Sequence, residues 1–90
     1  VPVSTDGIVK IYPNPTNGKL NIVYQAGEAQ KLNLDVFNVV GQNMFNNVYE
    51  LEAGLHTIVL DAVDYAKGVY ILDLQNRTSG NKYQSKFIKE

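Results

Sequence analysis

The sequence offers few residues for catalysis or for tight metal binding. It contains one histidine, His56, and no cysteine, which excludes a disulfide framework, a thiolate zinc site and a thiol nucleophile. No second histidine and no metal-binding motif accompanies His56, which stands two residues before Ile58 in an alternating segment. We therefore expect His56 to be a packing or edge residue of a strand, and not a metal ligand.

Carboxylates and hydroxyls are present but form no recognisable catalytic pattern. Asp61, Asp64 and Asp73 could approach one another at one end of a folded domain, but their spacing matches no calcium-binding loop. The serines lack a neighbouring base motif, and the turn glycines form no phosphate-binding loop. We therefore expect no enzyme activity, no cofactor and no metal, with calcium binding as a weaker alternative.

Six tyrosines could stack against sugar rings or could pack in a core. They are Tyr12, Tyr24, Tyr49, Tyr65, Tyr70 and Tyr83. Tyrosines at alternating positions are more often core or sheet-face residues, so the sequence favours the structural interpretation.

The net charge of −1 is unevenly distributed. Residues 1–76 contain four lysines and eight acidic residues, a net charge of −4, whereas residues 77–90 carry +3. The basic segment is either an ordinary solvated strand or a signal for a receptor, and charge alone favours the first interpretation. A pI of about 5.7, with no basic stripe of interleaved aromatics, argues against nucleic-acid binding.

Length and hydrophobic pattern together indicate the fold class. Ninety residues with 44% hydrophobic and 19% charged side chains correspond to one small globular domain. Apolar residues alternate with period two almost throughout, which predicts strands that bury one face. About seven such segments, separated by turn-forming residues, predict an all-β antiparallel sandwich.

The alternation also predicts which side chains point inward. They are Leu20, Ile22 and Tyr24; Leu32, Leu34 and Val36; Ile58 and Leu60; and Tyr70, Leu72 and Leu74. Residues 61–67 form a connection that has room for one helical turn but is too short for a stable helix.

Two groups of turn residues stand out. Pro13 and Pro15 remove two backbone donors after the first strand, and Gly18, preceded by an asparagine, can take the positive φ of a tight turn. Gly68 precedes the strongest predicted strand, in which Tyr70 resembles a tyrosine corner. In such a corner the hydroxyl binds a backbone group a few residues upstream.

Several segments together resemble a known family. They are residues 11–18, 34–42, 60–61, 67–72 and 86–89. Their order and spacing resemble the C-terminal sorting domain of the type IX secretion system of Bacteroidetes, type A. The resemblance covers residues 8–90, and residues 1–7 would be the linker from a preceding cargo domain. The structural motif positions are Pro13, Asn14, Pro15, Gly18, Gly41, Gly68 and Tyr70.

The resemblance implies an immunoglobulin-like sandwich with a delivery function. Such domains follow an independent cargo domain in a precursor that crosses the inner membrane by an N-terminal signal. Residues 1–4 lack the basic and apolar blocks of such a signal, so we expect the chain to be a piece of a longer protein. Shuttle proteins and the outer-membrane translocon then take the precursor from the periplasm to the cell surface or the extracellular space. A surface sortase usually removes the domain, and the cargo is released or attached to lipopolysaccharide.

The last alternating segment, residues 82–89, is the candidate signal. A terminal strand can present its backbone groups in place, or it can detach and add to a partner sheet. Lys86 and Lys89 would supply charge steering, and Phe87 or Ile88 an apolar anchor. We expect the cleavage bond in or before residues 1–7, where exposed backbone suits a protease.

Two other functions remain open on the sequence alone. The first is a carbohydrate-binding or adhesive sandwich appended to a secreted enzyme, which would need an exposed aromatic row or a calcium site. The second is a structural spacer, whose deletion would leave export intact.

Overall fold

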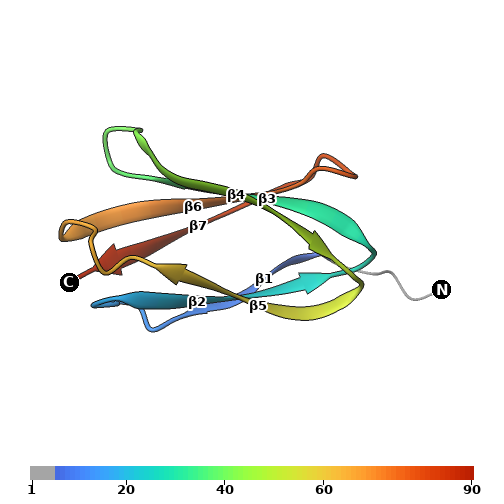
Figure 1. Cartoon of the computed structure of the whole chain (residues 1–90), viewed down its shortest axis with the longest axis horizontal. Coiled ribbons are helices and arrows are strands. Elements are labelled where there is room, and N and C mark those ends of the chain that lie inside the picture. Colours follow the sequence, from blue (N-terminus) through green and yellow to red (C-terminus); the bar gives the residue numbers. More distant parts are fainter. Residues whose placement is uncertain (1–5) are drawn as a thin grey trace.

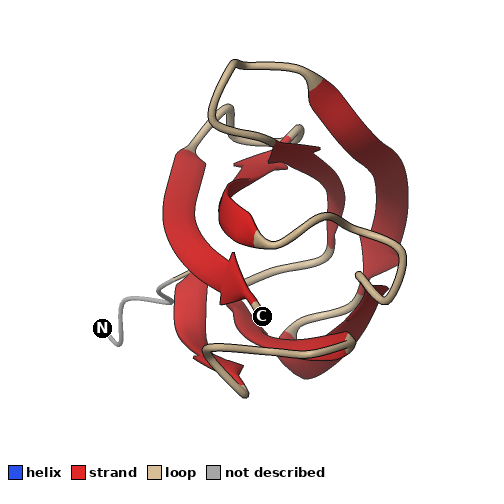
Figure 2. Ribbon diagram, turned by 90° about the vertical axis from the view of Figure 1, so that its left-hand side faces the viewer, coloured by secondary structure: helices blue, strands red, loops and turns tan. Residues whose placement is uncertain are grey.

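The segments of alternating hydrophobicity form strands in the computed structural model, which describes residues 6–90. Within that range the strands are β1 (Gly7–Tyr12), β2 (Lys19–Ala26), β3 (Gln30–Phe37), β4 (Asn43–Leu51), β5 (Gly54–Asp61), β6 (Gly68–Asn76) and β7 (Lys82–Lys89). They form a three-stranded sheet, β1-β2-β5, and a four-stranded sheet, β4-β3-β6-β7, with antiparallel pairing throughout (Figure 1). Figure 2 views the two sheets along the long axis. The prediction of an all-β antiparallel sandwich is confirmed, and the arrangement is compatible with an immunoglobulin-like fold.

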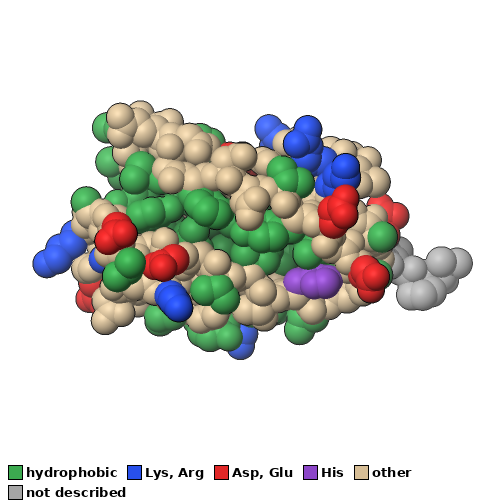
Figure 3. Space-filling model, in the orientation of Figure 1, with side chains coloured by type: hydrophobic (Ala, Val, Ile, Leu, Met, Phe, Trp, Pro, Cys, Tyr) green, Lys and Arg blue, Asp and Glu red, His purple; other side chains and the backbone are tan. Residues whose placement is uncertain are grey.

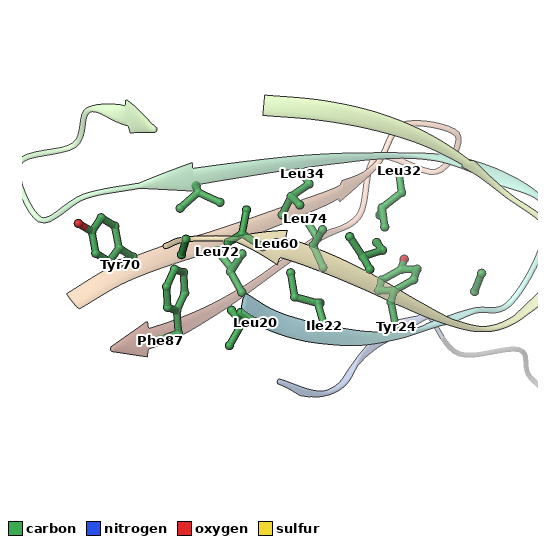
Figure 4. Close-up of a cluster of buried hydrophobic side chains, with 14 residues drawn as sticks. Leu20, Ile22, Tyr24, Leu32, Leu34, Leu60, Tyr70, Leu72, Leu74 and Phe87 are labelled. Atoms are coloured by element: carbon green, nitrogen blue, oxygen red, sulfur yellow. The ribbon is translucent and has the colours of Figure 1, made fainter. Parts of the chain in front are cut away.

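The hydrophobic core lies between the two sheets (Figure 4). Every side chain that the alternation places inward is buried, from Leu20 on β2 to Leu74 on β6. Each fully buried leucine or isoleucine contributes roughly 1.5–3 kcal/mol relative to an exposed one. Phe87 on β7 completes the core, with no exposed surface and its ring stacked on Tyr70 at a centroid distance of 5.4 Å.

Because neighbouring strands are antiparallel, the connections between strands lie at two opposite ends of the molecule. The longest dimension of the molecule is 44 Å. At the proximal end β1 begins, and the β2–β3, β4–β5 and β6–β7 turns lie there (Figure 1). At the distal end lie the β1–β2, β3–β4 and β5–β6 connections and the last residue of β7. The start and the finish of the folded module therefore lie at opposite ends.

Two local expectations differ from the structure or are sharpened by it. Gly18 does not adopt a positive φ, so the positive φ predicted for this turn is wrong. The 61–67 connection contains a turn closed by the Tyr65 N–H on the Ala62 carbonyl at 3.0 Å, and not a helical turn. Residues 6–90 contain no helix that could cross a membrane.

Candidate functional site at β7 and the distal end

The structure brings the separated motif segments together at the distal end. Residues 13–18 form the β1–β2 connection, Gly41 lies in the β3–β4 turn, and Gly68 begins β6 beside the end of β7. Antiparallel topology requires this gathering because every second connection returns to the same end. The candidate signal on β7 thus shares one end of the molecule with the predicted structural motif.

Thr16 organises the β1–β2 connection. Its side chain is buried, and its hydroxyl donates to the Lys19 carbonyl at 2.8 Å while accepting the Gly18 N–H at 3.2 Å. The Tyr12–Pro13 and Asn14–Pro15 peptide bonds are cis. The threonine hydroxyl closes the turn, which explains how Gly18 reverses the chain without a positive φ.

The same connection holds the end of β7, and residues 14–16 are called the clasp below. The Thr16 N–H donates to the Ile88 carbonyl at 2.8 Å, and the Glu90 N–H donates to the Thr16 carbonyl at 2.8 Å. The Asn14 side chain accepts the Ile88 N–H at 2.9 Å and donates to the Lys86 carbonyl at 3.4 Å. The clasp therefore covers the outer edge of β7 from residue 86 to residue 90.

The four candidate signal residues on β7 divide between the two faces of the sheet. Phe87 is fully buried, and Lys89 is only 8% exposed, with its Nζ donating to the Glu90 carbonyl at 3.0 Å. Lys86 is exposed, and Ile88 is 45% exposed. Of these four residues, Lys86 and Ile88 are the ones whose side chains a partner can reach while β7 stays in the sheet.

Tyr70 forms the corner that its position predicts. Its hydroxyl donates to the Ala66 carbonyl at 2.6 Å, and its ring lies 5.0 Å from the ring of Tyr65. Burial raises the pKa of Tyr65, and the charges of Tyr70 and Asp61 raise it further. The corner ties the β5–β6 connection to the core directly beside Phe87.

Gly41 closes the β3–β4 turn in a conformation that favours glycine. Its φ is +86°, and its N–H donates to the Asn38 carbonyl at 3.0 Å. The Asn38 side-chain oxygen accepts the N–H groups of Val40 and Gln42 at 3.1 and 2.9 Å. This turn exposes Val39 and Val40 at the distal end.

The aspartates considered for calcium are not brought together. Asp61 and Asp64 lie at the β5–β6 connection, whereas Asp73 lies in the middle of β6 opposite Asp35. The acidic side chains on the face shown in Figure 3 are scattered across it. His56 lies half-buried on the edge strand β5, with its Nε2 2.7 Å from the Glu52 carbonyl oxygen. This is the edge position expected for His56.

The tyrosines do not form an exposed row. Tyr24 and Tyr70 are buried in the core, and Tyr49, Tyr65 and Tyr83 are half-buried against it. Tyr12 is 43% exposed, with the Lys10 Nζ 5.0 Å from its ring centroid. The structural interpretation of the tyrosines is confirmed for the five that pack in or against the core.

A carboxylate that the sequence analysis missed lies at the proximal end. Asp6 accepts hydrogen bonds from the Gly27 N–H, from Gln30 Nε2 at 3.1 Å and from Asn76 Nδ2 at 2.9 Å. Partial burial raises the pKa of Asp6, but these bonds and one from Tyr83 outweigh it and hold the pKa below its usual value. Asp6, directly before β1, therefore binds the β2–β3 turn, the start of β3 and the end of β6.

Comparison with known proteins agrees with this geometry. Residues 10–90 match the family described as "Secretion system C-terminal sorting domain", a range that includes both the clasp and β7. The searches of curated proteins and of solved structures found no significant match. The match covers nearly the whole chain, so the chain belongs to the family of type IX secretion C-terminal sorting domains.

Proposed function

We propose that this domain carries a cargo protein to the type IX translocon and that β7, held by the clasp, is the part that the machinery recognises. Family membership makes the domain a sorting signal for export to the cell surface or extracellular space, and such a signal is not itself catalytic. The observation that carries the proposal is the joining of the motif at residues 13–16 to the candidate signal on β7. Segments that are distant in the sequence form one surface.

The finer steps of the route follow from this proposal. The cargo precedes residue 1 and is joined through a linker at residues 1–7, of which residues 1–5 lie outside the described part of the structure. Shuttle proteins and the outer-membrane translocon bind the domain during its transit of the periplasm. A surface sortase then cuts the chain before Asp6, because Asp6 and Gly7 are already held by the sandwich.

The roles of the four signal residues follow from their burial. Lys86 supplies a positive charge and Ile88 an apolar contact on the exposed side of β7. Phe87 and Lys89 face inward and keep the strand in place. Charge at the rim of a binding surface acts mainly on the rate of encounter, whereas a buried apolar contact acts on the lifetime of the complex.

A reporter fusion tests the proposal. A secreted reporter joined in front of residues 1–90 is expressed in a type IX-competent bacterium and in the same strain without its translocon. We expect export only in the competent strain, and loss of export when residues 83–90 are removed. Export of a folded truncated fusion would contradict recognition through β7.

Truncation removes Phe87 from the core, so a second variant separates folding from recognition. The double substitution Lys86→Gln and Ile88→Thr changes only exposed side chains and keeps residues that suit a strand. We expect this variant to melt at nearly the wild-type temperature and to be exported less efficiently. Wild-type export of the double variant would contradict the roles given to these two side chains.

A further inference from the structure

β7 is an edge strand whose outer edge is only half covered. It pairs with β6 in a regular antiparallel register from Lys82 to Lys89. The N–H and C=O groups of Ile88 both bind the clasp, so they point away from β6. Alternate residues of a strand point the same way, and the backbone groups of Lys82, Gln84 and Lys86 therefore also point outward.

The outward groups between residues 82 and 86 are the part of this edge that pairs with no strand in the described residues. Within residues 6–90 no strand pairs with this edge, and the clasp reaches no further than the Lys86 carbonyl. Lys82, Gln84 and Lys86 are all exposed. This open part of the edge thus carries backbone donors and acceptors that bond to no other strand.

The side chains beside this open edge determine which strand it can accept. Lys82 and Lys86 lie on either side of Gln84 along β7. On the neighbouring strand β6, Lys82 pairs with Gln75 and Lys86 pairs with Ile71. Asp73 stands opposite Gln84, so one negative charge lies between two positive charges. Lysines on an edge strand discourage pairing with a second copy of the same edge, whereas an acidic strand would be attracted.

We propose that an extended acidic segment of the secretion machinery adds to β7 as a further strand along residues 82–86. This inference rests on the proposed function and names the chemistry of the partner. Main-chain hydrogen bonds to the outward groups give affinity, and acidic side chains at alternate positions of the partner pair with Lys82 and Lys86. The clasp ends the added strand at residue 86 by occupying the edge beyond it.

The packing of β7 against the core favours its staying in the sheet during this pairing. Phe87 is fully buried and stacked on Tyr70, and Leu72 and Leu74 on β6 lie in the same core. Detaching β7 would expose Phe87 and break its whole ladder with β6. Addition of a partner strand needs neither change, since it uses the outward groups of Lys82 and Gln84 and the outward N–H of Lys86, none of which bonds to β6.

A proline tests the backbone edge without touching the core. The Gln84 N–H faces away from β6, so Gln84→Pro removes an outward donor and leaves the β6–β7 ladder intact. Gln84→Ala is the matched control, because it removes the same side chain and keeps the donor. We expect both fusions to fold, and export of Gln84→Pro to fall by about tenfold relative to Gln84→Ala, the upper range for one lost hydrogen bond.

Two results would overturn the proposal and leave the sorting function standing. One is equal export of the folded Gln84→Pro and Gln84→Ala fusions when the wild-type fusion is exported. The other comes from nuclear magnetic resonance of residues 1–90 titrated with the synthetic peptides Glu-Val-Glu-Val-Glu and Lys-Val-Lys-Val-Lys. We expect amide shifts at Lys82, Gln84 and Lys86 with the acidic peptide only, and equal shifts with both peptides, or none there, would contradict it. Failure of the wild-type fusion to be exported would instead contradict the sorting function itself.

Discussion

The side chain of Asn14 takes the place of a backbone strand beside Ile88. Its Oδ1 accepts the Ile88 N–H at 2.9 Å, and its Nδ2 donates to the Lys86 carbonyl at 3.4 Å. The prolines on either side, Pro13 and Pro15, have no N–H to donate, so the side-chain amide supplies both the donor and the acceptor. Asn14, near the start of the domain, thereby covers the outer edge of the last residues of β7.

Removal of this amide should loosen the end of β7. Asn14→Ala leaves the Ile88 N–H without its partner, and we expect a loss of about 0.5–1.5 kcal/mol in the free energy of unfolding. Hydrogen exchange at the Ile88 amide should become faster, while exchange at Phe87, which pairs with Tyr70 on β6, should change little. Asn17→Ala, an exposed change in the same connection, is the control and should leave both unchanged.

Loss of the Tyr70 hydroxyl should destabilise the domain without emptying the core. Tyr70→Phe keeps the ring that stacks on Phe87 and removes the hydrogen bond to the Ala66 carbonyl. We expect a cost of about 0.5–1.5 kcal/mol in urea unfolding, the usual contribution of one intramolecular hydrogen bond. Tyr12→Phe removes a hydroxyl from an exposed ring and should cost far less. Equal costs for the two variants would contradict the corner.

Phe87 and Ile88 are adjacent, but substituting them should affect different properties. Loss of the Phe87 side chain should lower stability, whereas loss of the Ile88 side chain should affect recognition. Phe87→Ala removes a fully buried ring, and we expect a loss of about 3–5 kcal/mol in stability. Ile88→Ala changes a side chain that is 45% exposed and should cost under about 1 kcal/mol. An export defect in Phe87→Ala therefore reports unfolding, whereas one in Ile88→Ala reports recognition. Thermal melts of both purified variants distinguish these causes.

Asp6 should make stability depend on acid pH. Its pKa is lower in the folded state than in the unfolded state, so the unfolded chain binds the proton more readily. The stabilisation is complete above the usual aspartate pKa of about 3.9 and is lost as the pH falls through the lowered folded value. Asp6→Asn should flatten this acid dependence and cost about 1–3 kcal/mol at neutral pH.

Chemical unfolding between pH 2 and pH 7, a range of about five units around the aspartate pKa, measures this dependence. Asp64→Asn changes an exposed carboxylate in the β5–β6 connection and serves as the control. An identical acid slope in the wild type and in Asp6→Asn would show that Asp6 is not responsible.

The sequence predicts the strands well because local alternation determines which side chains are buried. Leu20, Ile22 and Tyr24 recur every second residue, and all three are fully buried. Tyr70 was also predictable, since a tyrosine corner places its acceptor only a few residues upstream. Both the alternating strands and the tyrosine corner depend on residues within a single short segment of the sequence.

The missed features depend on contacts between distant segments. Asp6 lies outside the alternating pattern, and its partner Asn76 is 70 residues away. The clasp joins Thr16 to Ile88, and no local pattern indicates such a pairing. Lys89 was expected to supply charge at the surface, yet its place on the inward face beside the clasp leaves it only 8% exposed.

The most direct test of recognition through β7 is a pair of charge reversals in the reporter fusion. Lys86→Glu changes an exposed side chain on β7, and Lys31→Glu changes one on β3 that is 64% exposed. Exposed charges contribute only about 0–1 kcal/mol to stability, so both fusions should remain folded. We predict that Lys86→Glu reduces export and that Lys31→Glu leaves it at the wild-type level. Equal export of the two folded variants, or a defect confined to Lys31→Glu, would contradict recognition through β7.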